Sequence, residues 1–152
     1  MSEPFDSPDF DLPPDDVMAI SLPPHSVEAE QSVLGGLLLE NSAYDRIADI
    51  LTEEDFYRQE HRYVFRAIAR LIELSRPADV VTVQEQLQQQ DELAAVGGLP
   101  YLISLAQNTP SAANIRRYAE IVRERSVRRQ LAKVGTDIAE MARNPQGREA
   151  SQ

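Results

Sequence analysis

The sequence predicts an all-α fold, and three observations lead to this prediction. Apolar residues recur three and four places apart through most of the chain after Pro24, which is the spacing of one face of a helix. Residues that cap helices, and Gly or Pro residues that end them, separate these stretches. We find no paired alternating stretches that would indicate a β-hairpin, and no internal repeat with a period of about 20 to 50 residues. We therefore expect a compact multi-helix head followed by one long helix.

Residues 1–22 differ from the rest of the chain in composition. They contain six acidic residues, no basic residue and four prolines. Such a segment buries too little apolar surface to offset the entropy lost on folding. We predict that residues 1–22 form a disordered acidic tail, that residues 23–125 form the head, and that residues 126–152 form an arm beyond it.

The first helix of the head is expected to begin at His25 or Ser26, either of which can act as its N-cap. It carries an apolar face of Val and Leu residues and ends near Asn41. The Gly35–Gly36 pair inside it is not followed by a dinucleotide-binding fingerprint, so close packing against another helix is the simpler explanation. Ser42 then opens a short second helix.

The clearest amphipathic helix of the head is expected over residues 56–74. Thr52, followed three places later by Asp55, resembles a capping start for the turn before it. The acidic cluster Glu53, Glu54 and Asp55 could hold a metal ion, but acidic residues are common where a helix begins. We therefore interpret this cluster as structural.

Two further helices complete the expected head. Thr82 and Glu85 have the spacing of a capping box, so we expect a helix over residues 84–90 and not a strand. After a Gly-Gly break, Pro100 suits the first turn of a helix that ends at Asn108.

Residues 113–143 can form one helix whose apolar face changes direction halfway. With about 100° of rotation per residue and Ile115 at zero, one set of apolar side chains points to about 340° and a second set to about 120°. The first set is Ile115, Tyr118, Ala119 and Val122, and the second is Val127, Leu131, Val134, Ile138 and Met141. The first set can complete the core of the head. The second has the alternating four and three spacing of a helix that pairs with another helix.

We call the second set, Val127, Leu131, Val134, Ile138 and Met141, the apolar stripe and take it as the candidate partner-binding site. Full burial of one such side chain is worth about 1.5 to 3 kcal/mol, so exposure of all five to water is unfavourable. We expect another chain, or a continuation of this one, to cover the stripe. The head surface around Tyr101 is the alternative binding site.

Basic residues concentrate in the first half of the long helix, although the net charge of the chain is −10. Residues 115–133 contain six arginines and one lysine against two glutamates. These bases point in all directions around the helix, whereas a DNA-binding helix places them on one face. The spacings Glu120–Arg123 and Glu124–Arg128 favour ion pairs along a solvated surface. We expect no specific DNA binding by this chain.

No cluster of residues suited to catalysis stands out. The chain has no cysteine, and its one lysine, Lys133, does not belong to a phosphate-binding loop. His25 and His61 have no metal-ligating partner at helical spacing, and we interpret each as a surface or capping group. We expect that the chain is not an enzyme and that it binds no cofactor or metal.

The sequence also bears on cellular location. Its longest apolar stretch, 33–39, is far shorter than the roughly 20 residues of a membrane-spanning helix. The N-terminus is acidic and lacks the basic and apolar regions of a secretory signal. We expect a cytoplasmic protein without a membrane partner.

Three segments together resemble the N-terminal domain of the bacterial replicative DNA helicase, the DnaB family. They are PPHSVEAEQSVLGGLLLE at 23–40, DFYRQEHRYVFRAI at 55–68 and NTPSAANIRRYAEIVRER at 108–125. A shorter match, AVGGLPYL at 95–102, supports the resemblance. It covers residues 23 to about 147 in order, and the acidic tail carries no motif of the family.

The resemblance implies a fold and a set of partners. In that family this domain is an all-helical head followed by a helical hairpin, and six copies form a collar of three dimers above a ring of ATPase domains. Residues 126–152 would then contain the first arm of the hairpin and the start of the connection to an ATPase domain, with the second arm beyond Gln152. Primase and a helicase loader are the implied partners. The motor domain is not in this sequence, so ATP and magnesium are expected only with that domain.

Three functional hypotheses follow. The leading one is a non-catalytic N-terminal assembly and protein-interaction domain of a replicative DNA helicase, which self-associates and docks the primase during DNA replication. The alternative is a regulatory adaptor that binds nucleic acid through the basic half of the long helix. An independent enzyme comes third, because no catalytic residues support it.

Overall fold

The computed structural model of the chain describes residues 22–145. The acidic tail predicted over residues 1–22 therefore lies, apart from Leu22, outside the described residues. Residues 146–152 of the predicted arm also lie outside them.

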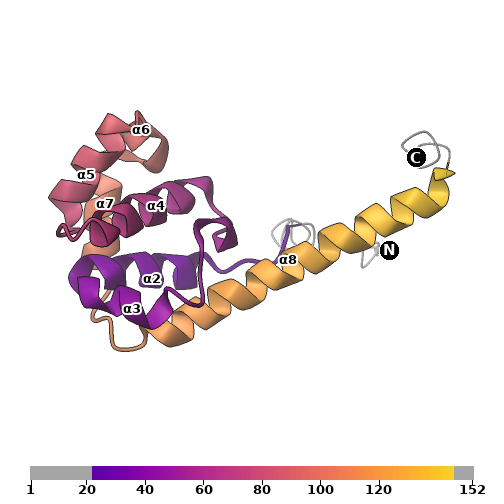
Figure 1. Cartoon of the computed structure of the whole chain (residues 1–152), viewed down its shortest axis with the longest axis horizontal. Coiled ribbons are helices and arrows are strands. Elements are labelled where there is room, and N and C mark those ends of the chain that lie inside the picture. Colours follow the sequence, from indigo (N-terminus) through magenta and orange to yellow (C-terminus); the bar gives the residue numbers. More distant parts are fainter. Residues whose placement is uncertain (1–21, 146–152) are drawn as a thin grey trace, which may run out of the picture.

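Between residues 22 and 145 the secondary structure is entirely helical, which confirms the predicted fold class. The elements, labelled as in Figure 1, are α2 (Val27–Leu39), η3 (Asn41–Ala43), α3 (Tyr44–Ile47), η4 (Glu53–Asp55), α4 (Gln59–Glu73), α5 (Val80–Gln89), α6 (Leu93–Val96), α7 (Gly98–Gln107) and α8 (Ile115–Arg143). The four-residue helix α6 was not predicted from the sequence. It ends at Gly97, whose φ of 102° lies in the left-handed region that suits glycine.

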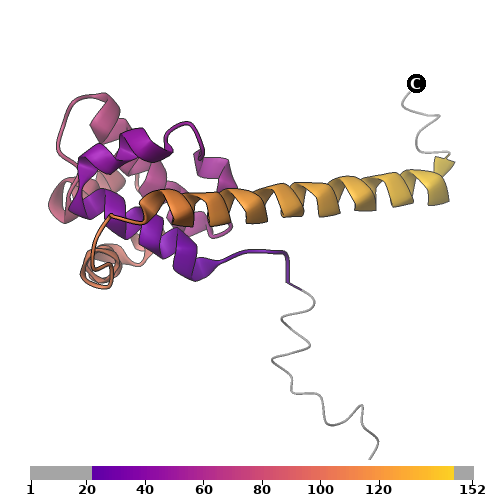
Figure 2. The same cartoon turned by 90° about the horizontal axis from the view of Figure 1, so that it is seen from below.

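Helix α2 lies at the centre of the head, where it contacts α4, α7 and α8. Its apolar residues are buried nearly all the way round, as expected for a helix with neighbours on several sides. The largest fully buried apolar side chains come from six different elements and the loop before α4; they include Leu34, Leu37, Ile47, Phe56, Ile68, Leu87, Leu102 and Ile115. The first turns of α8 close this core, and the rest of α8 leaves the head as a straight rod (Figures 1 and 2).

The Gly35–Gly36 pair allows this close packing, as predicted. A Cβ atom added at Gly35 would collide with the Thr109 side chain and with the carbonyl oxygen of Leu105. A Cβ atom at Gly36 would lie 3.1 Å from Cδ1 of Ile115. The two glycines therefore let α2 approach the end of α7 and the start of α8.

Two predicted helix starts are confirmed. The Ser26 hydroxyl accepts a hydrogen bond from Ala29 N at 3.2 Å and caps α2. Thr52 and Asp55 form a capping box around η4, in which the Asp55 carboxylate accepts a hydrogen bond from Thr52 N at 2.9 Å.

The predicted start of α5 is wrong. Helix α5 begins at Val80, four residues before the predicted 84–90 segment, and its N-cap is Asp79. The Asp79 carboxylate accepts a hydrogen bond from Thr82 N at 2.9 Å, while the Thr82 hydroxyl accepts one from Asp79 N at 2.8 Å. Thr82 therefore completes the capping box and does not open it, because an aspartate three residues earlier takes the N-cap position.

We predict that Gly35→Ala lowers the free energy of unfolding by about 1 to 3 kcal/mol, since the new methyl group collides with a carbonyl of the backbone. Gly135→Ala in the exposed part of α8 is the matched control, because nothing lies within 4 Å of its Cβ position. That control should gain about 0.5 to 1 kcal/mol from helix propensity. Urea denaturation of both variants tests the prediction, and equal stability of the two would contradict it.

Candidate functional site

The apolar stripe lies on the part of α8 that projects from the head (Figure 1). Ile115, Ala119 and Val122 are buried against the head. The stripe side chains that follow are exposed, from 37 % at Val127 to 66 % at Leu131. The predicted change of face is confirmed, because a single helix buries one apolar set and exposes the other.

The point where α8 leaves the head is held by the carboxylate of Asp55, which is only 2 % exposed. Its Oδ1 atom accepts hydrogen bonds from the Ser126 hydroxyl and from Arg123 Nη1, both at 2.8 Å. Since a buried carboxylate needs such partners, these contacts favour one direction of α8 relative to η4. The acidic cluster predicted at 53–55 is structural, as expected, but Asp55 also binds a helix far along the chain.

A second contact fixes the same region of α8. The Arg129 guanidinium donates hydrogen bonds to the carbonyl oxygens of Pro24 at 2.8 Å and Asp55 at 2.7 Å. It also lies over the Tyr57 ring, 5.4 Å from the centroid, and His25 stacks on the same ring at 4.3 Å. Burial lowers the pKa of Arg129. His25, predicted as a surface or capping group, is half-buried and supports the ring on which Arg129 lies.

The other basic residues of α8 are mostly engaged with carboxylates. Glu124 pairs with Arg128 at 3.7 Å, as predicted, and also with Arg125. The predicted Glu120–Arg123 pair is wrong, because Arg123 binds Asp55 and Glu120 pairs instead with Arg116 and Arg117, each at 3.8 Å. Because each of these two glutamates is shared by two arginines, the ion pairs offset only part of the positive charge of α8.

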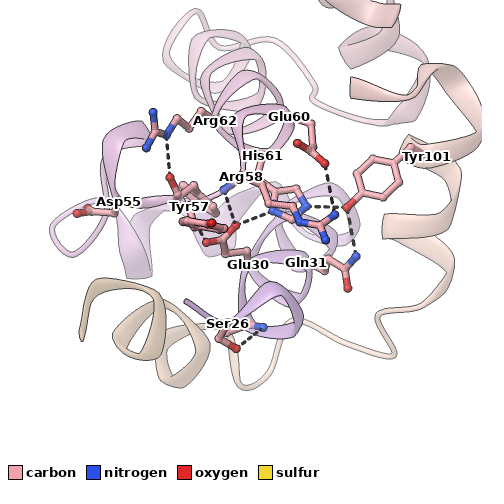
Figure 3. Close-up of polar contacts among 12 residues, drawn as sticks. Ser26, Glu30, Gln31, Asp55, Tyr57, Arg58, Glu60, His61, Arg62 and Tyr101 are labelled. Carbon is pink, nitrogen blue, oxygen red and sulfur yellow. Dashed lines mark hydrogen bonds and ion pairs between the residues drawn. The ribbon is translucent and has the colours of Figure 1, made fainter. Parts of the chain in front are cut away.

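The interpretation of His61 as a surface or capping group is wrong, because its side chain is completely buried. Its Nδ1 atom lies 2.7 Å from the Glu30 carboxylate, and its Nε2 atom lies 2.6 Å from the Tyr101 hydroxyl (Figure 3). Gln31 Nε2 donates to the same hydroxyl at 3.2 Å. Because a carboxylate only accepts hydrogen bonds, Nδ1–H of His61 donates to Glu30.

The Glu30 carboxylate is the centre of this network. It also accepts hydrogen bonds from the backbone nitrogens of Tyr57 at 2.7 Å and Arg58 at 3.4 Å (Figure 3). Residues from α2, α4 and α7 thus meet around one buried charge. Tyr101, the predicted alternative binding site, is half-buried, with its hydroxyl turned toward His61. Burial raises the pKa of Tyr101.

Helical spacing contained a signal for this network. His61 precedes Val64, Phe65 and Ile68 on the apolar face of α4, and Glu30 stands on the buried side of α2. A polar residue on an apolar helix face is expected to be paired, so both positions could have been assigned to the core.

Residues 22–145 contain no group of three or more His, Cys, Asp or Glu side chains that could hold a metal ion. Within the same residues, no helix is long and apolar enough to cross a membrane. The expectation that the chain binds no cofactor stays a prediction.

These features define a class of protein domain, an all-α head that holds one projecting helix with an exposed apolar stripe. A family model described as DnaB-like helicase N terminal domain matches residues 22–124. The replicative DNA helicase DnaB of Haemophilus influenzae is 43 % identical over 130 residues, which cover 86 % of this chain and 28 % of that protein.

Solved structures agree with the sequence matches. The crystal structure of the N-terminal domain of DnaB helicase from Mycobacterium tuberculosis matches with a TM-score of 0.78 and 41 % identity, over 80 % of this chain and 84 % of that chain. The N-terminal domain of DnaB helicase from Helicobacter pylori, solved in work on its interactions with primase, has a TM-score of 0.64 over 76 % of this chain and 89 % of that chain. At 23 % identity that second match shows the shared fold alone.

The chain therefore belongs to the family of DnaB-like helicase N-terminal domains. It corresponds to the non-catalytic N-terminal part of replicative DNA helicases and spans 28 % of the length of the Haemophilus influenzae relative.

We predict that Asp55→Ala lowers the free energy of unfolding by about 2 to 4 kcal/mol, because Ser126 loses its buried partner and Thr52 loses its capping bond. The neighbouring exposed residue Glu54 forms no ion pair within residues 22–145, so Glu54→Ala should change stability by less than about 0.5 kcal/mol. Thermal and urea denaturation measure both effects. A stable Asp55→Ala variant would show that α8 is held by its apolar contacts alone.

Alkaline pH should destabilise the fold partly through Tyr101. Its folded pKa is raised above the value of about 10 in the unfolded chain, so its contribution is fully present below about pH 10. That contribution is lost as the pH rises toward the folded pKa. Tyr101→Phe should therefore show a smaller fall in unfolding free energy above about pH 10 than the parent chain. Identical pH profiles would contradict this assignment.

Proposed function

We propose that this chain is the assembly and partner-binding domain of a replicative DNA helicase, acting in DNA replication. The apolar stripe of α8 pairs copies of the chain into dimers, and three such dimers form a collar in the full-length hexamer. The same domain docks the primase and a helicase loader. The exposure of the stripe on a helix that is firmly held by the head is the observation that carries this proposal.

The energetics favour pairing of moderate strength. Leu131, Val134 and Ile138 are 66, 52 and 57 % exposed. Complete burial of these three side chains on both of two paired helices would contribute about 9 to 18 kcal/mol as an upper bound. Association costs about 4 to 15 kcal/mol in lost translational and rotational freedom. We therefore expect a dimer that dissociates on dilution.

Primase docking is supported by the likeness of the fold. The Helicobacter pylori domain described above and a DnaB-like replicative helicase were both solved in work on their interactions with primase. The second matches with a TM-score of 0.65 and 23 % identity over 81 % of this chain and 29 % of that one. We extend this partner to the present chain, with the stripe as the first candidate surface and the surface around Tyr101 as the second.

We predict that replacing Leu131 and Ile138 by Asp weakens self-association by a factor of about 100 or more, because pairing would bury two unpaired charges. Helical content and stability of the head should stay nearly unchanged. Sedimentation equilibrium over a range of concentrations measures the association, and circular dichroism measures the fold.

Ala132→Asp with Thr136→Asp is the matched control, since both positions lie on the opposite face of α8 and the change in charge is the same. The control should associate like the parent chain. Loss of the folded head in the Leu131 and Ile138 variant would make the stripe part of the core. If that variant changes neither self-association nor primase binding, the surface around Tyr101 becomes the better candidate.

A further inference from the structure

A groove of about 440 Å³ lies between α3, the η4 turn and α4, away from the apolar stripe. Its lining divides into an apolar floor and a charged rim. The floor consists of Ala48, Leu51, Phe65 and Ala69, and the rim includes Glu53, Glu54, Glu73, Arg66 and Arg70. Thr52 also lines the groove and donates to the Asp55 carboxylate, whereas no lining residue belongs to the Glu30–His61–Tyr101 network.

The floor has the size and chemistry to take an aliphatic side chain. Leu51 and Phe65 are 3 and 4 % exposed and form its base. Ala48 is the C-cap residue of α3, and Ala69 lies on α4. Each side chain has only one carbon atom, which leaves open space above the base. A branched side chain placed there would exchange water contact for contact with these four residues.

Carboxylates stand at both ends of the groove. At one end Glu73 accepts a hydrogen bond from the Tyr44 hydroxyl at 3.1 Å. At the other end are Glu53 and Glu54, and Glu53 contacts Arg66 at 3.1 Å. Burial together with this hydrogen bond raises the pKa of Tyr44.

The balance of charge in the groove is negative. Arg66 is held by two carboxylates, Glu53 at 3.1 Å and Glu92 at 2.5 Å, so its charge is already neutralised. Arg70 forms no ion pair within residues 22–145, but it lies at the border with a neighbouring cleft that Gln86 and Gln90 also line. Glu54 and Glu73 remain without a basic partner among the same residues.

We propose that this groove binds a protein segment in which an aliphatic side chain is flanked by two basic residues. The aliphatic side chain fills the space over Leu51 and Phe65, and the two bases pair with Glu73 at one end and with Glu54 at the other. The site is separate from the apolar stripe, so it can be occupied while α8 is paired. An acidic segment is disfavoured, because its charges would face Glu54 and Glu73.

Three capped peptides of equal length test the proposal by nuclear magnetic resonance of the full chain with labelled Ala and Leu methyl groups. Their central residues are Arg-Leu-Arg, Glu-Leu-Glu and Arg-Ser-Arg. We expect only the first to shift the methyl signals of Ala48, Leu51 and Ala69 in a saturable way. Equal binding of the acidic peptide would overturn the charge assignment, and equal binding of the serine peptide would overturn the role of the apolar floor.

Two substitutions make the test specific. Ala69→Trp fills the groove and should abolish the shifts, with Ala95→Trp on the exposed side of α6 as its control. Glu54→Arg should weaken binding of the basic peptide by about tenfold, with Glu85→Arg on α5 as its control. Circular dichroism checks that each variant is folded. Unchanged binding in the folded Glu54→Arg and Ala69→Trp variants would overturn the proposal.

The chain alone, examined over a range of concentrations, provides the last comparison. If the same methyl signals shift on concentration without peptide, and this shift persists in the Leu131→Asp and Ile138→Asp variant, a second copy occupies the groove and the proposed partner is wrong. Signals that stay constant with concentration support a partner other than this chain.

Discussion

The shape of the molecule depends on the hydrogen bonds between the buried Asp55 carboxylate and α8. Burial of this carboxylate would be costly without partners, and Ser126 and Arg123 supply them from the turn of α8 that leaves the head. Arg129, one turn further, binds the carbonyl oxygen of the same residue. These bonds hold α8 at one angle, so its distal half extends away from the head (Figure 2). Leu131, Val134 and Ile138 on this half are 66, 52 and 57 % exposed.

A second buried carboxylate organises the other side of the same loop. Glu30 accepts hydrogen bonds from the backbone of Tyr57 and Arg58 and contacts His61. The segment from Asp55 to His61 is therefore fixed at both ends by buried carboxylates: Asp55 accepts hydrogen bonds from α8, and Glu30 of α2 binds Tyr57, Arg58 and His61. Because Tyr57 also supports Arg129, the support of α8 and the position of Tyr101 belong to one connected set of contacts.

Most of the helices could be predicted from the sequence, because apolar spacing reflects burial directly. The change of face between Val122 and Val127 is visible in the same spacing. The polar contacts could not be predicted in this way. His61 and Glu30 are separated by 31 positions, and Ser126 and Asp55 by 71, so no local pattern pairs them. Arg123 shows the difficulty. Glu120 has the helical spacing for an ion pair with it, but Arg123 binds the buried Asp55 instead.

The start of α5 was predicted wrongly for a related reason. Thr82 fits a capping box both as its first residue and as its last, and only the local backbone decides between them. The roles of the stripe and of Tyr101 in binding do not follow from burial or from spacing. Exposure shows that a surface is accessible, but it does not identify the partner that covers the surface.

Helix α8 runs through head and arm as one element of 29 residues without a break. Inserting a single residue between Val122 and Val127 would rotate everything beyond it by about 100° and advance it by about 1.5 Å. The stripe would then face a different direction, and Arg129 would lose the carbonyl oxygens of Pro24 and Asp55. The number of residues in this short segment is therefore constrained, because an insertion or a deletion keeps the stripe on its present face only when it restores the same rotation.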